Sequence, residues 1–130
     1  MQITNYTNHM MKPIAIVSLF FLCVTACKKE TLHEEAVEVC GVSDPIHNLK
    51  WLNAEYELLV GGPEMNGVIL YRYEGRDVIE VQSSVFSSFN GHQYYCDGTK
   101  LELDGNEALD KFRRERVLVS VLYGTDIWKE

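Results

Sequence analysis

Apolar residues recur every three or four positions between residues 44 and 60. This period matches the turn of an α-helix and predicts one helix over residues 44–60, with Asp44 capping the free amides and Pro45 in the first turn. A Gly-Gly-Pro sequence at 61–63 should end the element. The helix is expected to bury one apolar face, formed by Ile46, Leu49, Leu52, Tyr56 and Leu59.

The period then changes to two. Residues 68–73 and 78–82 are rich in β-branched and aromatic residues, and a Glu-Gly pair at 74–75 joins them as a two-residue hairpin turn. Such a turn places Arg72 opposite Asp77. One face of the hairpin should belong to the core: Val68, Leu70, Ile79 and Val81. The other is expected to be a partly aromatic outer face: Ile69, Tyr71, Tyr73, Arg76, Val78 and Glu80.

A second hairpin is predicted from residues 92–96 and 99–103 across the turn Asp97-Gly98. Its apolar face should contain Tyr94, Cys96, Leu101 and Leu103. The serine-rich segment 83–91 between the two hairpins is expected to be a loop that carries Phe86 and Phe89.

The last third of the chain holds two further elements. Residues 106–116 predict a short helix with Ala108, Leu109 and Phe112 directed inward. Residues 117–123 are apolar at almost every position, which favours a central strand buried on both sides; Trp128 should fold back from the tail. These elements predict an α+β domain, with an antiparallel four- to five-stranded sheet packed by one N-terminal amphipathic helix and one short helix.

The N-terminal pattern is typical of a bacterial lipoprotein signal. Residues 14–24 are apolar except for one serine, Lys12 precedes them, and small residues lead to Cys27. Eleven residues are too few to span a membrane, which takes roughly 20. We therefore expect removal of residues 1–26, lipid on Cys27, a flexible tether over 27–39 and one domain over 40–130. The alternative is a secretory signal that is cut elsewhere.

Charge restricts the partners. The chain has 12 basic and 19 acidic residues and a net charge of −7. The predicted signal removes one lysine, so the mature chain would be more acidic still, which argues against nucleic acid and against electrostatic docking on anionic lipid. Membrane attachment would then depend on the acyl chains. Lys28 follows Cys27 in place of the aspartate that retains lipoproteins at the inner membrane, which favours the outer membrane.

The cysteines indicate an oxidising compartment. Cys23 leaves with the signal and Cys27 takes the lipid, so Cys40 and Cys96 remain. A cysteine pair in an exported domain predicts a disulfide. Two free thiols or a metal-binding pair are the alternatives.

Candidate chemistry is sparse in the sequence. It contains no nucleophile elbow, phosphate loop or zinc-protease motif, and the histidines of the mature chain (His33, His47 and His92) assemble no ligand set. We therefore expect no catalytic residues, no cofactor and no metal. Arg113, Arg114 and Arg116 form a basic patch that is either a solvated helix face or a partner surface. The best candidates for partner binding are aromatic, unless helices cover them: Tyr71, Tyr73, Phe86 and Phe89.

Several short motifs resemble small lipoproteins of Bacteroides- and Flavobacterium-type bacteria. The motifs are Cys40 with Asp44-Pro45, the helix residues Leu49, Trp51 and Leu52, the hairpin residues Tyr71, Tyr73 and Gly75, and the Tyr-Cys-Asp-Gly segment at 95–98. The resemblance covers most of residues 40–123. It implies a helix against an antiparallel sheet, similar to β-lactamase-inhibitor-like modules, and it implies no catalytic residues.

The sequence therefore predicts a lipid-anchored envelope protein that is not an enzyme and that binds another protein or a peptide. The alternative is an accessory lipoprotein that binds a small ligand or carbohydrate through its aromatic residues.

Overall fold

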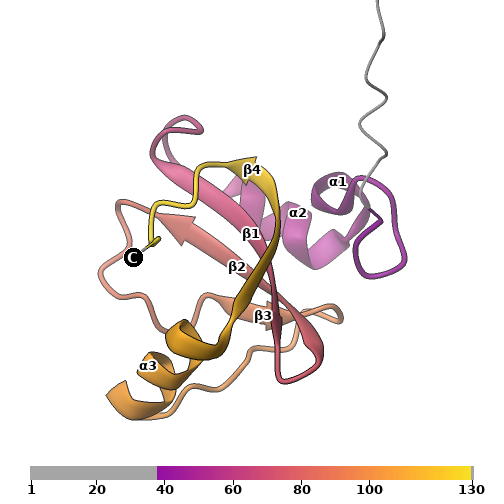
Figure 1. Cartoon of the computed structure of the whole chain (residues 1–130). Coiled ribbons are helices and arrows are strands. Elements are labelled where there is room, and N and C mark those ends of the chain that lie inside the picture. The colour runs from indigo at the N-terminus through magenta and orange to yellow at the C-terminus, as the bar shows by residue number, and fades with distance from the viewer. Residues whose placement is uncertain (1–37, 130) are drawn as a thin grey trace, which may run out of the picture. The chain divides into compact units, whose positions relative to one another are not determined.

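The computed structural model describes residues 38–129. Four strands form one antiparallel sheet in the order β3-β2-β1-β4, and three helices pack around it (Figure 1). The prediction of an α+β fold with an antiparallel sheet is confirmed. The elements are α1 (Pro45–Asn48), α2 (Lys50–Glu57), β1 (Asn66–Tyr73), β2 (Arg76–Ser83), β3 (Gln93–Tyr95), α3 (Gly105–Glu115) and β4 (Val117–Gly124).

The β1–β2 hairpin has the predicted register over its whole length. Arg72 faces Asp77, and their side chains form an ion pair at 3.1 Å. Glu74 and Gly75 both have positive φ, of 47° and 75°. Two positive values match the twist of the flanking strands, which is why a glycine at this turn predicts the register so well.

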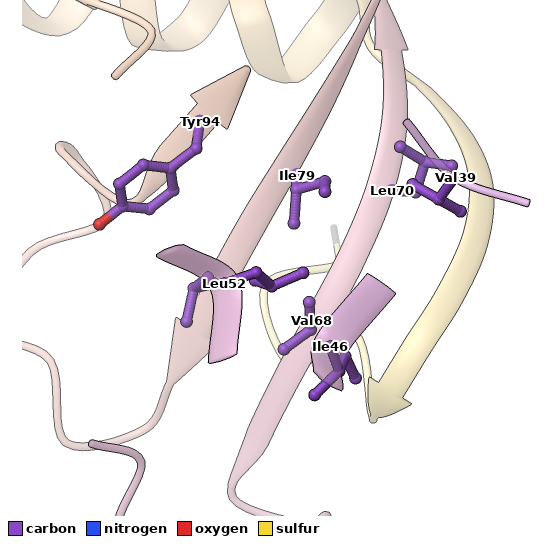
Figure 2. Close-up of a cluster of buried hydrophobic side chains, with 8 residues drawn as sticks. Val39, Ile46, Leu52, Val68, Leu70, Ile79 and Tyr94 are labelled. Atoms are coloured by element: carbon purple, nitrogen blue, oxygen red, sulfur yellow. The ribbon is translucent and has the colours of Figure 1, made fainter. Parts of the chain in front are cut away.

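The sheet has a core on each face. On one face, residues of β1 and β2 pack against α1 and α2, and Figure 2 shows this first cluster with Ile46 and Leu52 directed at the sheet. On the other face, Phe112 of α3 packs against Tyr71 and Tyr73. The predicted aromatic outer face is therefore wrong, since Tyr71 is 3% exposed and Tyr73 is 6% exposed. The short helix covers this face, as the alternative interpretation held.

The N-terminal helix is broken. It is extended at Leu49, between α1 and α2, and it ends at Glu57, short of the predicted boundary. Asp44 makes no side-chain cap, because its φ of 49° is left-handed; its carboxylate accepts a hydrogen bond from His47 Nδ1 at 2.8 Å. The predicted apolar face is still the one that turns inward, since Ile46 and Leu52 are both buried.

The second hairpin differs from the prediction by one residue. Tyr94 pairs with Lys100, and the amide of Gly98 donates to the carbonyl of Tyr95 at 3.0 Å. With Gly98 at a φ of 84°, the loop has three residues and ends in a left-handed glycine, a common alternative to the two-residue turn. A shift of one residue reverses the side chains. Leu101 and Leu103 therefore join the second cluster, whereas Tyr94 lies in the first.

The C-terminal strand lies at the edge of the sheet. β4 pairs with β1 alone among the described strands, and four of its residues are 45% to 62% exposed: Val117, Leu118, Val119 and Val121. The prediction of a central strand is wrong. A continuous apolar run is typical of a strand buried on both faces, but the run itself does not say whether two neighbours exist.

The predicted disulfide joins Cys40 to Cys96. Trp51 of α2 packs on the same turn, where its indole N–H donates to the carbonyl of Cys96 at 3.0 Å. Val39, which the sequence assigned to the tether, is buried in the first cluster. Cys27 and the predicted signal at 1–26 lie outside the described residues. Within residues 38–129, no helix has the length and apolar character that crossing a bilayer requires.

Candidate ligand-binding site

The predicted binding aromatics separate into two pairs. Tyr71 and Tyr73 are buried under α3, so neither offers a surface to a partner. Phe86 and Phe89 lie in the loop between β2 and β3. Phe86 stacks on the ring of His92 at 4.1 Å, and Phe89 meets Trp128 edge-on at 4.9 Å. Trp128 does fold back from the tail, as predicted, and is buried.

These aromatic rings border a hollow of about 530 Å³. Its size falls within the range of small-molecule sites. Two cationic side chains line it and no acidic one does. We call it the aromatic hollow, and its lining residues are Ser83, Ser84, Phe86, Phe89, Arg113, Ile127, Trp128 and Lys129.

A buried polar network lies beside the hollow, on the α3 face of the sheet. The carboxylate of Glu80 accepts hydrogen bonds from Arg116 Nη1 at 2.7 Å, Gln82 Nε2 at 2.8 Å and Gln93 Nε2 at 2.9 Å. All four side chains are buried. A charge out of water is costly unless it is paired and hydrogen-bonded, and this carboxylate has both kinds of partner.

The same network holds the C-terminal tail. Gln82 Oε1 accepts from the amides of Ile127 at 2.9 Å and Trp128 at 3.3 Å, and Gln82 Nε2 donates to Asp126 at 2.8 Å. Tyr71 also donates to Asp126, at 2.9 Å, and burial raises the pKa of this phenol well above its ordinary value. Tyr71 therefore acts as a neutral hydrogen-bond donor that fixes the tail.

A smaller hollow of about 200 Å³ extends towards β4. It shares Arg113 and Lys129 with the aromatic hollow and reaches Leu118 on the edge strand. Arg116 lies over the ring of Tyr71, at 4.2 Å from its centroid, and closes the inner side of this space.

The predicted basic patch is divided by the fold. Arg116 is buried and paired with Glu80, and Arg113 lines both hollows. Arg114 faces a different part of the surface, beside Asp104 and Glu107. Only Arg113 is thus both near the aromatic rings and within reach of a ligand.

Sequence reasoning missed the residues that build this site. The signal was Glu80, an acidic residue on a hairpin face that otherwise carried Ile69, Tyr71 and Val78. Gln82 and Gln93 gave no comparable signal, because glutamine is usual on a solvated strand face.

His92 is the one histidine near the aromatic hollow. Burial, with help from the charge of Lys100, lowers the pKa of its imidazole, so the ring that stacks on Phe86 is neutral at pH 7. Within the described part of the chain, no group of three or more His, Cys, Asp or Glu side chains could hold a metal ion.

Comparison of the chain with protein-family models, with curated proteins and with solved structures found no significant match. The resemblance to small envelope lipoproteins therefore stays a prediction.

Proposed function

We propose that this chain is a lipid-anchored binding module of the bacterial envelope, and that it recognises another protein by adding an extended segment of that protein to β4. The observation that carries the proposal is the open apolar edge of the sheet. The edge runs through eight residues, Val117–Gly124, without a charge or a proline. Exposed edges of this kind are templates for pairing with another chain, and natural proteins usually protect them.

The backbone of β4 supports strand addition. Half of the amides and carbonyls of an antiparallel strand point to each side, and β1 uses one side of β4. A partner strand would pair with the outward groups, and its alternate side chains would meet the exposed valines and Leu118.

Two bulges favour a specific partner over indiscriminate pairing. The register with β1 shifts between Val68 and Ile69 and again between Leu70 and Tyr71, each time leaving one extra residue in β4. Bulges increase the local twist of a strand and interrupt its ladder. A partner must match this twist, which disfavours a second flat edge of the same kind.

Photo-crosslinking in the cells that produce the chain tests strand addition. A benzoylphenylalanine at Val119, in the full-length chain, should give a discrete adduct, and the same group at Leu58, which is exposed on the other side of the molecule, should not. Val121→Lys should abolish the adduct. With purified components, the partner should slow hydrogen exchange at the amides of β4. An adduct that contains a second copy of this chain, or equal adducts from Val119 and Leu58, would contradict the proposal.

Mass spectrometry of the mature N-terminus tests the envelope anchor separately. The expected product begins with an acylated Cys27. An intact N-terminus without lipid would overturn the anchor.

A further inference from the structure

The charge of the aromatic hollow is opposite to that of the protein. The chain carries a net charge of −7, yet Arg113 and Lys129 line this hollow without an acidic neighbour in its wall. Their guanidinium and ammonium groups are donors that suit a carboxylate, and an arginine can bind one through two parallel hydrogen bonds.

The rest of the wall is flat and apolar. Phe89 is 44% exposed, and its ring meets Trp128 edge-on. The guanidinium of Arg113 lies 4.5 Å from the centroid of Phe89, so the positive charge is directly next to an aromatic surface. A ligand that fits both features has a planar apolar body with an anionic group at one end.

Buried amides hold the walls in place before any ligand arrives. Gln93 Nε2 donates to the carbonyl of Phe89 at 2.7 Å, and Gln82 Oε1 holds the backbone of Ile127 and Trp128. In Figure 1 the C-terminal tail lies beside the loop between β2 and β3, and these two segments form opposite walls. Because the walls are already ordered, binding loses little conformational entropy.

We propose that the aromatic hollow is a binding site for a small aromatic carboxylate. The carboxylate contacts Arg113 and Lys129, and the ring packs against Phe89 and Trp128. The hydroxyls of Ser83 and Ser84 provide further hydrogen bonds. This site goes beyond strand addition, because none of its lining residues belongs to β4.

Binding of 2-naphthoate to the full mature chain, measured by calorimetry and by NMR shift changes, tests the proposal. Two matched probes separate the contributions: 2-naphthamide keeps the rings without the charge, and glucuronate keeps the charge without the rings. A charge-assisted hydrogen bond accounts for about tenfold in affinity. We expect 2-naphthoate to bind about tenfold more tightly than 2-naphthamide, and glucuronate to bind more weakly still.

Variants on α3 locate the site. Arg113→Gln should weaken 2-naphthoate binding about tenfold and leave 2-naphthamide binding unchanged, whereas Arg114→Gln, one residue away and outside the hollow, should change neither. Phe89→Ser should weaken both naphthalene probes, with thermal unfolding confirming that each variant is folded.

Several outcomes would overturn the site: no binding of 2-naphthoate, equal affinity for acid and amide, glucuronate binding as tightly as 2-naphthoate, or equal losses in Arg113→Gln and Arg114→Gln. Val119→Lys tests its independence of strand addition. This variant should leave 2-naphthoate binding intact, even if it abolishes the protein adduct, and a loss of 2-naphthoate binding would contradict a separate site.

Discussion

The two edges of the sheet are treated in opposite ways. At the β3 edge, the chain turns back and covers the strand: the amide of Tyr95 donates to Thr99, and the amide of Leu101 donates to Gln93, both at 2.8 Å. At the β4 edge, no described segment takes this place, and four apolar side chains face solvent. One edge is closed to partners and the other is open.

The two edges are also held by different means. The closed edge is fixed from outside by the disulfide, which ties the turn after β3 to Cys40. The open edge is fixed from inside, because Arg116, the residue that precedes β4, is paired with buried Glu80. An anchor beneath the strand leaves its outward hydrogen-bonding groups available. The comparison therefore indicates that the β4 edge is stable enough to remain open.

Removal of the disulfide should have the largest effect. The crosslink spans 56 residues of sequence, and a loop of this length stabilises a fold by about 4 kcal/mol through the entropy of the unfolded chain. Urea unfolding of Cys40→Ser/Cys96→Ser should show a loss of this size, and wild-type protein in reducing agent should behave in the same way. A loss below about 1 kcal/mol would show that the closed edge does not depend on the crosslink.

Breaking the buried ion pair should come next. Glu80→Gln leaves Arg116 buried without a counter-charge and should destabilise the domain by about 3 kcal/mol. Lys111→Gln is the matched control, because Lys111 and Glu74 also lie 2.7 Å apart but are exposed on the surface. Urea unfolding should detect no change in the control. Equal effects in the two variants would mean that burial does not decide the strength of the anchor.

The fold could be predicted where one local signal was decisive. The glycine of the Glu74-Gly75 turn set a register that the structure reproduces, and the disulfide followed from the compartment and the count of cysteines. The second hairpin failed because Asp97-Gly98 suits both a two-residue and a three-residue loop. Trp51 packs against Gly98 in the observed turn, a contact between distant residues that no local pattern contains.

The open edge and the aromatic hollow could not be predicted, because both depend on long-range arrangement. An apolar run such as residues 117–123 has the same sequence whether its strand is central or at an edge. The walls of the hollow come from the β2–β3 loop, from α3 and from the tail, and they meet only through Gln82 and Gln93. The sequence named Phe86 and Phe89 as candidates but not the partners that make a site of them.

Acid should weaken the closed edge through His92, by less than either substitution above. An unfolded histidine has a pKa of about 6.5, and burial lowers the pKa of His92 in the folded protein. The folded state then binds fewer protons, so this contribution to stability is complete above pH 6.5 and is lost as the pH falls through the folded pKa. His92→Phe keeps a ring on Phe86 without the titration. Unfolding free energies measured from pH 7.5 to pH 5.5 should fall more steeply for the wild type, and parallel curves would rule His92 out.

Charge at the open edge should have the smallest effect on stability. Val119 is about half exposed on β4, and Val119→Lys should change the free energy of unfolding by no more than about 0.5 kcal/mol. Val78 of β2 is fully buried, so Val78→Lys is the contrasting variant and should prevent folding. If Val119→Lys were as damaging as Val78→Lys in urea unfolding, the β4 edge would be covered in the folded protein, and the two edges would not differ. If Val119→Lys folds normally, the loss of a partner in this variant reports on the edge itself, because lysine on an edge strand opposes pairing without disturbing the sheet beneath it.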